Sequence, residues 1–312
     1  MKSNMKNAIV GYTGFVGSNI ISQAHFDKLY NTTNIEEAFG SNPDTLVYAG
    51  VKAAKYLANS NPNMDFEDIQ AAISNVEKIN PKRIILISTI DVYIKPQNVN
   101  EDSLIEINEA EPYGANRLYL EEWVENYYSD HLVVRLPGLY GNNLKKNFIY
   151  DLMNEIPRFL SREKYKELYS QNPKISNYYF KQDNGYYKCR ELESVELKRL
   201  KEYFISSDFS AVNFTDSRAQ YQFYNLAYIW KHILIALNNN LKKINIATEP
   251  VMMSELYEFI KGKSIMNHCV DFPPTYDMKT KHSGLYGGQN GYILDKVSVM
   301  EDIKKFVQTE NQ

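Results

Sequence analysis

The first half of the chain alternates between two hydrophobic patterns. Short apolar runs, which are typical of buried strands, occur at 7–10, 28–30, 45–49, 83–88 and 132–136. Between them, apolar residues recur at every third or fourth position, which predicts helices at about 16–25, 35–39, 65–79 and 113–128. Continuous apolar strands that alternate with helices are typical of a parallel sheet covered by helices on both faces.

This alternation fades after residue 141. The stretch 144–215 is helical and loop-like and rich in Tyr, Lys and Glu, and strand or helix patterns return at 222–237, 243–247, 254–261 and 297–307. We therefore expect an α/β fold with two domains. The first is a doubly wound parallel sheet formed by residues 1–142 plus 217–247. The second is smaller and mostly helical, and it is formed by residues 143–216 plus 248–312.

Composition narrows the class of protein. The chain has 312 residues, 44% of them hydrophobic and 23% charged, which is the balance of a globular protein of about two domains. Its 35 basic and 38 acidic residues lack the basic excess that nucleic-acid binders usually show. The longest apolar runs are far shorter than the roughly 20 residues that span a bilayer. We therefore expect a cytoplasmic protein that binds neither nucleic acid nor membrane.

Metal and disulfide chemistry have little support in the sequence. Cys189 and Cys269 are the only cysteines, too few for a disulfide framework or a cysteine-rich metal site. His232, His268 and His282 show no metal-ligand spacing. We therefore expect no bound metal.

A glycine-rich turn directly follows the first predicted strand. Gly11, Gly14 and Gly17 have the spacing GxxGxxG, which 14 glycines in 312 residues produce by chance only about 0.03 times per chain. Gly14 would let a backbone approach a diphosphate, and Gly17 would let the following helix pack on the strand. The helix N-terminus would offer free N–H groups to the phosphates. The turn predicts dinucleotide binding, and a tight turn without a ligand is the alternative.

The GxxGxxG spacing resembles that of the short-chain dehydrogenase/reductase superfamily. The chain length and two later motifs resemble its extended branch, the NAD-dependent epimerase/dehydratase family, whose members mostly modify nucleotide-linked sugars. The resemblance covers residues 8 to about 260. It implies a Rossmann-type fold and NAD or NADP as the cofactor. The residues that it places around the cofactor are Gly11, Thr13, Gly14, Phe15, Val16, Gly17, Asn31, Thr32, Ala49, Gly50, Ser88, Tyr113, Arg117 and Pro137.

The second predicted strand lacks one usual feature of dinucleotide-binding folds. An acidic residue near the end of that strand normally binds the ribose diol. Here the strand ends in Tyr30-Asn31-Thr32-Thr33, with neither an acid nor an Arg that could hold a 2′-phosphate. Asn31 and Thr32 could hydrogen-bond a ribose or a phosphate, so the choice between NAD and NADP stays open.

Two segments resemble the catalytic motifs of the family. The segment 88–93, STIDVY, is similar to S-[ST]-x-x-V-Y, which implies that Thr89 is the catalytic hydroxyl. The segment 113–117, YGANR, resembles YxxxK, and its spacing puts Tyr113 and Arg117 on one face of a helix. The strand end 135–141, RLPGLYG, follows in the family's order.

These residue types suit hydride transfer at a carbinol carbon, during which a Tyr exchanges a proton with a sugar hydroxyl. A free Tyr has a pKa of about 10, so work at neutral pH requires a fall of about three units. A fixed cation one helical turn away and the charge of the nicotinamide would supply that fall, and Thr89 would orient the same oxygen. Where the family has Lys, this chain has Arg117, which keeps the positive charge but cannot release a proton.

Further positions are assigned by the resemblance alone. Asp91 stands where the sugar dehydratases of the family have the acid that removes the C5 proton, and an Asx turn explains it equally well. The loop expected to open the substrate domain holds the candidate residues Asn143, Lys145 and Lys146; the two lysines would meet a diphosphate or form a solvated basic turn. Arg218 precedes a segment similar to the family motif R-[DE]-F-I-Y-V-x-D, and the resemblance makes it a candidate substrate-binding residue. When the segment is aligned with the motif, Gln220 and not Arg218 stands at the position of the motif's Arg.

We interpret the chain as an NAD(P)-dependent nucleotide-sugar epimerase or keto-reductase. Tyr113 is the expected acid/base, Thr89 orients it, Arg117 holds the cofactor and tunes Tyr113, and Asp91 is a second base. The rival interpretation is a catalytically impaired NAD(P)-binding sensor or scaffold on the same fold, which Arg117 and the incomplete second-strand site favour. The expected partner is a nucleotide-sugar substrate, and a homodimer is compatible with the resemblance.

Overall fold

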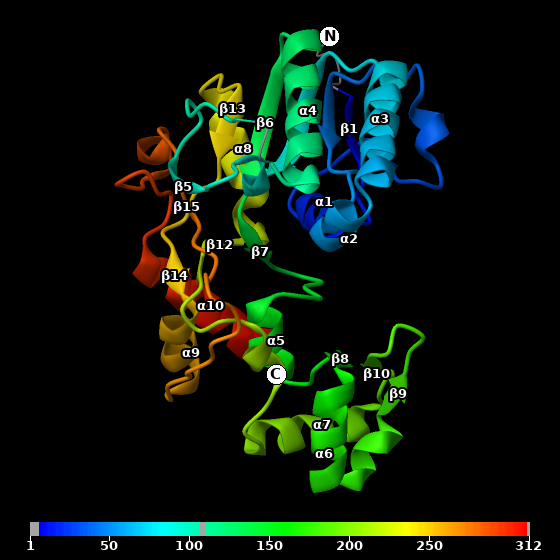
Figure 1. Cartoon of the computed structure of the whole chain (residues 1–312). Coiled ribbons are helices and arrows are strands. Elements are labelled where there is room, and N and C mark those ends of the chain that lie inside the picture. The colour runs from blue at the N-terminus through cyan, green and yellow to red at the C-terminus, as the bar shows by residue number, and fades with distance from the viewer. Residues whose placement is uncertain (1–5, 107–109, 311–312) are drawn as a thin grey trace. The chain divides into compact units, whose positions relative to one another are not determined.

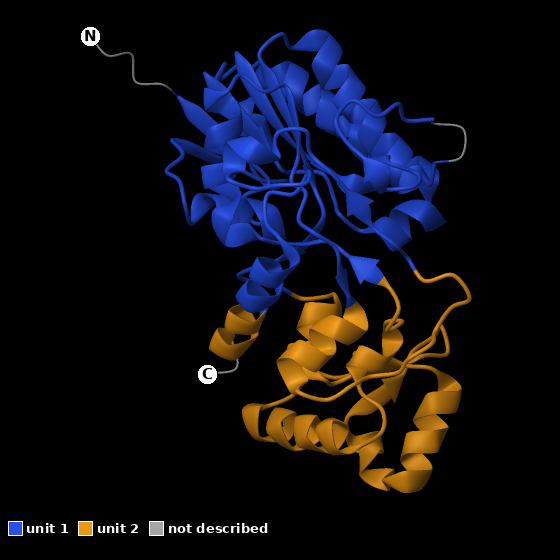
Figure 2. Ribbon diagram, turned by 90° about the vertical axis from the view of Figure 1, so that its left-hand side faces the viewer, with its two compact units in different colours: residues 1–144, 220–252, 274–303 blue, residues 145–219, 253–273, 304–312 orange. Residues whose placement is uncertain are grey.

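The computed structural model describes residues 6–106 and 110–310 and divides into two compact units (Figures 1 and 2). Unit 1 comprises residues 1–144, 220–252 and 274–303, and unit 2 comprises residues 145–219, 253–273 and 304–312. The largest difference from the boundaries expected from the sequence is the stretch 274–303, which belongs to unit 1. The outermost residues of the two expected domains, 1–5 and 311–312, lie outside the described residues.

A parallel sheet of six strands forms the centre of unit 1, which confirms the predicted fold class. The strand order is β13-β6-β4-β3-β1-β2. In chain order, the strands are β1 (Asn7–Val10), β2 (Lys28–Tyr30), β3 (Thr45–Tyr48), β4 (Arg83–Thr89), β6 (His131–Leu136) and β13 (Lys243–Asn245). Because every pair is parallel, all six strands end at the same edge of the sheet.

Helices cover both faces of this sheet. Alternate strand residues such as Ile9 and Ile85 pack with α1 (Phe15–Ile21) and α8 (Ile229–Asn238). Their neighbours, such as Ala8 and Ile84, point to the opposite face and pack with α3 (Pro62–Ile79) and α4 (Pro112–Tyr127). Proline at the first helical position begins both α3 and α4, where its missing N–H costs no hydrogen bond.

Short strand pairs complete unit 1. The pairs are β5 (Gln97–Val99) with β15 (Asp277–Met278), β7 (Gly138–Tyr140) with β12 (Phe223–Asn225), and β11 (Gln220–Tyr221) with β14 (Val251–Met252). Of their strands, only β12 falls where the sequence pattern predicts one, at the start of the segment 222–237. Each strand has two or three residues, which is too short for a hydrophobic period to show. A short helix, α2 (Lys55–Ser60), follows β3.

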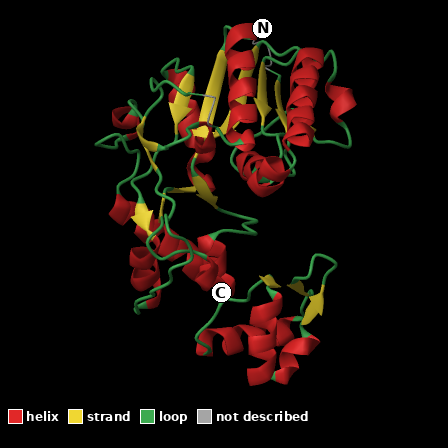
Figure 3. Cartoon of the chain, in the orientation of Figure 1, coloured by secondary structure: helices red, strands yellow, loops and turns green. Residues whose placement is uncertain are grey.

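Unit 2 is mostly helical, as Figure 3 shows by colour. Its helices are α5 (Phe148–Asn154), α6 (Arg162–Gln171), α7 (Ser194–Ser206) and α9 (Met253–Lys261), while α10 (Lys296–Glu310) begins in unit 1 and ends in unit 2. A small antiparallel sheet has the order β8 (Phe159–Leu160), β10 (Tyr187–Cys189), β9 (Tyr179–Lys181). Many of the tyrosines of this segment pack against one another or against the core; Tyr165 and Tyr187, for example, stack with ring centroids 3.7 Å apart.

Two classes of feature are missing from the part of the chain that the structure describes. None of the helices there combines the length and the apolar character that crossing a bilayer demands. Over the same residues, no three or more His, Cys, Asp or Glu side chains gather into a group that could hold a metal ion.

A buried ion pair joins α4 to the central strand β6. Glu121 and Arg135 have side chains that are each only 1% exposed, and Arg135 Nη2 lies 2.6 Å from Glu121 Oε2. The Ser88 hydroxyl donates to the same carboxylate, and Arg135 Nη1 donates to the Tyr93 hydroxyl at 2.6 Å. Since each charge in this pair depends on its partner, removal of one leaves the other buried and uncompensated.

We therefore expect Glu121→Gln to lower the free energy of unfolding by about 3–5 kcal/mol, measured by urea denaturation. The matched control is Asp130→Asn, which removes the half-exposed partner of Arg83 and is expected to cost at most about 1 kcal/mol. Equal, small losses for both variants would show that the buried pair contributes no more than a surface pair.

Candidate active site

The glycine turn lies between β1 and α1 and is shaped by close backbone contacts. Gly11 has a φ of +89°, and a Cβ there would lie 2.4 Å from the carbonyl oxygen of Ala49. A Cβ on Gly17 would lie 2.1 Å from the carbonyl oxygen of Gly11. These two positions therefore require glycine for packing alone, with or without a ligand.

Gly14 is different, because it is exposed and its packing does not require glycine. A Cβ there would meet only the carbonyl oxygen of Gly11, at 3.2 Å, and the residue is the N-cap of α1. Beyond it, the first N–H groups of the helix, on Phe15, Val16 and Gly17, have no partner within the helix. An exposed glycine beside these donors leaves room for a diphosphate, so the turn fits a dinucleotide.

The other predicted cofactor residues lie around the same edge of the sheet. Thr13 is exposed in the turn, Ala49 and Gly50 follow β3, and Pro137 follows β6. The side-chain oxygen of Asn31 accepts hydrogen bonds from the N–H of Thr33 at 2.9 Å and from the hydroxyl of Thr33 at 2.6 Å. That oxygen is committed to a local turn, and the neighbouring Thr32 is exposed after β2.

Ser88, another residue expected to contact the cofactor, has a buried side chain whose hydroxyl donates to Glu121. Its hydrogen-bonding capacity is therefore used in the core of unit 1. Its contact with the cofactor stays a prediction.

Thr89 and Tyr113 come together at the carboxyl end of β4. Thr89 is the last residue of that strand, and Tyr113 stands in the first turn of α4. The Thr89 side chain acts on the Tyr113 phenol and lowers its pKa. The main-chain N–H of Tyr113 donates to Asn59 Oδ1 at 3.0 Å, which ties the start of α4 to α2. The structure thus pairs the two groups that the sequence motifs single out.

The charge balance at Tyr113 differs from the sequence expectation. The Tyr113 side chain is only 7% exposed, and burial raises the pKa of its phenol above the usual value. Arg117 and the Thr89 side chain oppose this effect, and the carboxylates of Asp91 and Asp65 add to it. In the protein without cofactor, the effect of desolvation on the Tyr113 pKa is therefore larger than that of the nearby cation, and the protonated side chain is the stable form.

Arg117 is held by other partners as well as by Tyr113. Its guanidinium carbon lies 3.9 Å from the centroid of the Tyr113 ring, a cation–π contact. The same group forms an ion pair with Asp65, and both side chains are at least 93% buried. Its Nη2 also donates to the carbonyl oxygen of Lys52 at 2.6 Å. The planar guanidinium can serve these partners at once, which a point-like ammonium cannot.

Asp91 lies beside Thr89 in the turn that follows β4, and its carboxylate is fully engaged. Asp91 Oδ1 accepts hydrogen bonds from Lys55 Nζ at 2.9 Å and from the Tyr276 hydroxyl at 3.1 Å. Asp91 Oδ2 lies 3.3 Å from the Thr89 hydroxyl. The role of Asp91 as a second base stays a prediction.

Lys55 and Tyr276 are site residues that sequence reasoning missed. Lys55 begins α2 and also pairs with Glu111 Oε2 at 2.9 Å, while Tyr276 precedes β15, 185 residues after Asp91 along the chain. Burial opposes the charge of Lys55, but Asp91, Tyr276 and Glu111 together hold its pKa above the usual range. No local motif joins these residues, so only the fold brings them to one place.

The predicted substrate-binding residues fall in both units. Asn143 is exposed at the end of unit 1 with a φ of +68°, and Lys145 and Lys146 are exposed at the start of unit 2. Arg218 lies in unit 2, where it forms an ion pair with Asp216 at 2.8 Å. Their roles toward a substrate stay predictions.

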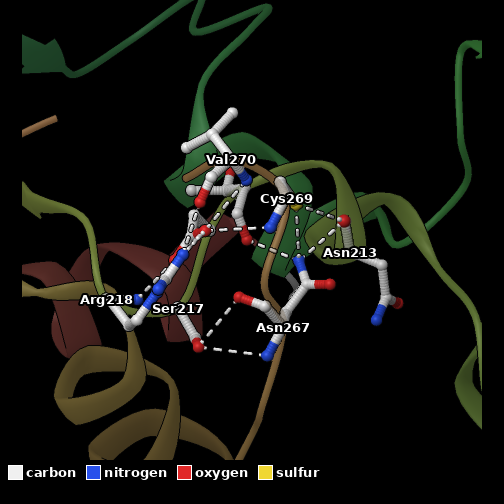
Figure 4. A network of polar contacts seen from close by, with 8 residues as sticks. Asn213, Ser217, Arg218, Asn267, Cys269 and Val270 are labelled. Carbon is white, nitrogen blue, oxygen red and sulfur yellow. Dashed lines mark hydrogen bonds and ion pairs between the residues drawn. The ribbon is translucent and has the colours of Figure 1, made fainter. Parts of the chain in front are cut away.

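Arg218 belongs to a polar network within unit 2 (Figure 4). Asp216 accepts from the side chain of Arg218 and from the main-chain N–H of Cys269 at 2.8 Å. Asn267 bridges the same loops through the carbonyl oxygens of Asn213 and Thr215. This network fixes the loop 267–270 against the segment 213–218, so Arg218 already has a structural role.

Asp151 on α5 is a perturbed acid in unit 2 that the sequence did not single out. Burial alone raises the pKa of its carboxyl from 3.8 to about 7. Since the folded value lies above the unfolded one, ionisation at higher pH favours the unfolded state.

Asp151→Asn is therefore expected to stabilise the protein over the wild type, with a gain that grows as pH rises from about 4 to about 7 and is constant above. Urea denaturation at several pH values measures it. Asp183→Asn, at an exposed position of the same unit, is the control and should give no such trend. A pH-independent gain for Asp151→Asn would contradict the assignment.

A comparison with protein-family models identifies a family that resembles part of the chain. The family described as "NAD dependent epimerase/dehydratase family" matches residues 23–172, a stretch that begins after the glycine turn and includes Thr89, Tyr113 and Arg117. A search of curated proteins finds no match.

Solved structures with the same fold match nearly the whole chain at low sequence identity. A UDP-glucose 4-epimerase from Thermotoga maritima with UDP-glucose has a TM-score of 0.63 at 14% identity, covering 97% of this chain and 98% of that one. A dTDP-4-dehydrorhamnose reductase from Bacillus anthracis in complex with NADP has a TM-score of 0.61 at 13% identity, covering 99% of both chains.

A GDP-D-glycero-L-gluco-heptose synthase from Campylobacter jejuni, in the presence of NADPH, has a TM-score of 0.59 at 15% identity, covering 100% of this chain and 99% of that one. At such identities, these likenesses show a shared fold. The family match covers the Thr89 and Tyr113 segments, so residues 23–172 are similar to the NAD-dependent epimerase/dehydratase family.

Proposed function

We propose that this chain is an NAD(P)-dependent enzyme that epimerises or reduces a nucleotide-activated sugar, with Tyr113 as the acid/base. The observation that carries the proposal is the position of Thr89, the last residue of β4, and of Tyr113, in the first turn of α4, at the sheet edge where the glycine turn also lies. In open α/β sheets, ligands bind outside the carboxyl ends of the strands. A phenol and a phosphate cradle at one such edge are the two parts that this chemistry requires.

The cofactor site is supported by the backbone of the turn. Gly14 and the free N–H groups of Phe15, Val16 and Gly17 would hold the diphosphate, and the residues after β2 and β3 would meet the adenosine. When bound, the cofactor supplies or accepts the hydride. Since no acidic residue or Arg follows β2, the proposal covers both NAD and NADP.

Tyr113 would exchange the proton of the reacting sugar oxygen. Its buried phenol is protonated at neutral pH in the unloaded protein, because burial raises its pKa. It is therefore ready to donate to a carbonyl oxygen, which is the requirement of keto-reduction. Thr89 would orient this oxygen, and Arg117, stacked on the ring, would hold the phenol in place.

The substrate class rests on the known relatives of the fold. The structures with this fold include an epimerase, a reductase and a synthase whose printed names specify UDP-, dTDP- and GDP-linked sugars. We extend the shared class, a nucleotide-activated sugar, to this chain.

A second candidate is a non-catalytic NAD(P)-binding sensor or scaffold. The observation in its favour is the Asp65–Arg117 ion pair, which commits much of the Arg117 charge to a carboxylate. Under this alternative, the chain binds cofactor tightly and turns nothing over.

Turnover distinguishes the two candidates. We expect the protein to act on UDP-glucose, UDP-galactose or dTDP-4-dehydrorhamnose in the presence of NAD(P) or NAD(P)H. The reaction is measured in heavy water by the mass of the product and by the absorbance of the cofactor. Epimerisation leaves the cofactor unchanged, and reduction consumes it.

Tyr113→Phe should lower kcat by about 10²-fold or more and leave cofactor affinity unchanged, because only the exchangeable proton is removed. Equal activity of this variant would remove Tyr113 from the mechanism.

Gly14→Val tests the phosphate cradle. The new side chain would occupy the space beside the helix N-terminus, so NADP and NAD binding measured by calorimetry should be lost. Thermal unfolding serves as the control, since a side chain there meets only one backbone atom and the fold should persist. Unchanged affinity in a folded variant would move the diphosphate away from this turn.

A further inference from the structure

Gly114 lies directly after Tyr113 in the first turn of α4, and it is buried. A Cβ on this residue would lie 2.0 Å from the carbonyl oxygen of Asp91 and 3.0 Å from its carbonyl carbon. The backbone of α4 therefore approaches the turn Ile90–Val92 more closely than a residue with a side chain would allow. In the motif YxxxK this position is unspecified, so the sequence alone does not single it out.

Backbone conformation does not explain this glycine. Gly114 is not among the residues with a positive φ, and helices favour Ala over Gly where both fit. The close approach to the Asp91 carbonyl is therefore what requires a glycine at this position.

The approach brings three groups of the candidate active site together. Thr89 ends β4 immediately before the turn, Asp91 lies within the turn, and Tyr113 precedes Gly114. Both groups of the turn act on the pKa of the Tyr113 phenol, which Thr89 lowers and Asp91 raises. Because such effects weaken with distance, the spacing between the turn and α4 determines how strongly they act.

Tyr93, which follows the turn, anchors it in the core of unit 1. Its hydroxyl donates to the carbonyl oxygen of Asn100 at 2.7 Å. The same hydroxyl accepts from Arg135 Nη1 at 2.6 Å and from Asn245 Nδ2 at 3.0 Å. The Tyr93 side chain is only 4% exposed. A buried hydroxyl with three partners holds the end of the turn in one place.

Arg135 connects the turn to α4. Its guanidinium pairs with Glu121, about two helical turns after Tyr113, and also donates to the Tyr93 hydroxyl. The helix and the turn therefore share one buried anchor. A side chain at position 114 would press the start of α4 away from a turn that cannot retreat, and Tyr113 would move with it.

We propose that Gly114 and Tyr93 are positioning residues that together set the spacing between the Tyr113 phenol and the Thr89 hydroxyl. Gly114 lets α4 approach the turn, and Tyr93 holds the turn in place. The proposal rests on the proposed function, in which Tyr113 exchanges the proton of the substrate. Both residues act through Tyr113 and Thr89.

Gly114→Ala tests the close approach, with dTDP-4-dehydrorhamnose and NADPH, or UDP-glucose and NAD, as probes. Ordinary contacts begin at 3.4 Å and this one would be 2.0 Å, so the new Cβ forces the two backbones apart by about 1.4 Å. Since an error of about 1 Å can cost about 10²-fold in rate, we expect kcat to fall by about tenfold or more. The solvent deuterium isotope effect on kcat should rise, because proton transfer becomes the slow step. NADP affinity measured by calorimetry should not change.

Gly284→Ala is the matched control. Gly284 is exposed, and a Cβ there meets no atom of the described residues within 4 Å. This variant should match the wild type in kcat, in isotope effect and in NADP affinity.

Tyr93→Phe tests the anchor and keeps the buried ring, so it serves even if Gly114→Ala fails to fold. We expect kcat to fall by about threefold or more, with a larger solvent isotope effect and unchanged NADP affinity. Tyr179→Phe is its control, because that hydroxyl is also buried and donates to the carbonyl oxygen of Pro157 in unit 2. It should lower stability and leave kcat and the isotope effect of the folded protein unchanged.

The outcomes separate positioning from a purely structural role. Wild-type kcat in folded Gly114→Ala, or a loss of kcat in both variants without a change in the isotope effect, overturns the inference and leaves the enzyme assignment in place. A wild type that turns over no nucleotide sugar overturns both. Crystal structures of the wild type and Gly114→Ala test the spacing without turnover. A greater separation of the Thr89 and Tyr113 hydroxyl oxygens in the variant supports the inference, and an unchanged separation overturns it.

Discussion

The parallel pairing of six strands is the constraint on which the site depends. Because β1, β3 and β4 run in the same direction, the polar segments that follow them meet at one edge of the sheet. The glycine turn follows β1, and Thr89 ends β4. Apolar residues fill both faces of the sheet, so polar side chains are placed at the carboxyl ends of its strands. In open α/β sheets this is the end at which ligands bind.

Two ion pairs set the electrostatics around Tyr113. Arg117 is matched by Asp65 and Lys55 by Asp91, so each cation near the phenol has its own carboxylate. Burial therefore decides the state of the phenol and raises its pKa, although a cation lies over its ring. A protonated, buried phenol suits proton donation better than proton removal.

The sequence predicts those parts of the structure that depend on local pattern. The apolar runs locate the strands of the sheet, and the helical spacing locates α3 and α4 to within a few residues. The family motifs identify Thr89 and Tyr113, which the structure pairs. These successes share one cause, since period and motif are properties of consecutive residues.

The remaining parts depend on contacts between distant segments. Asp65, Lys55 and Tyr276 come from three separate elements, and no spacing relates them to Asp91 or Arg117. The same holds for Ser88, which the motif places at the cofactor but which a buried carboxylate from α4 engages. Likewise, strands as short as β11 and β14 exist only because they pair with each other. Sequence reasoning therefore named candidate residues at this edge of the sheet but not the charged side chains that contact them.

A crystal structure of the protein soaked with NADP+ tests the central claim most directly. The account predicts density for the diphosphate against Gly14 and the first turn of α1, with the nicotinamide beside the Tyr113 phenol. A nicotinamide far from Tyr113, or a glycine turn without density at saturating NADP+, would contradict it.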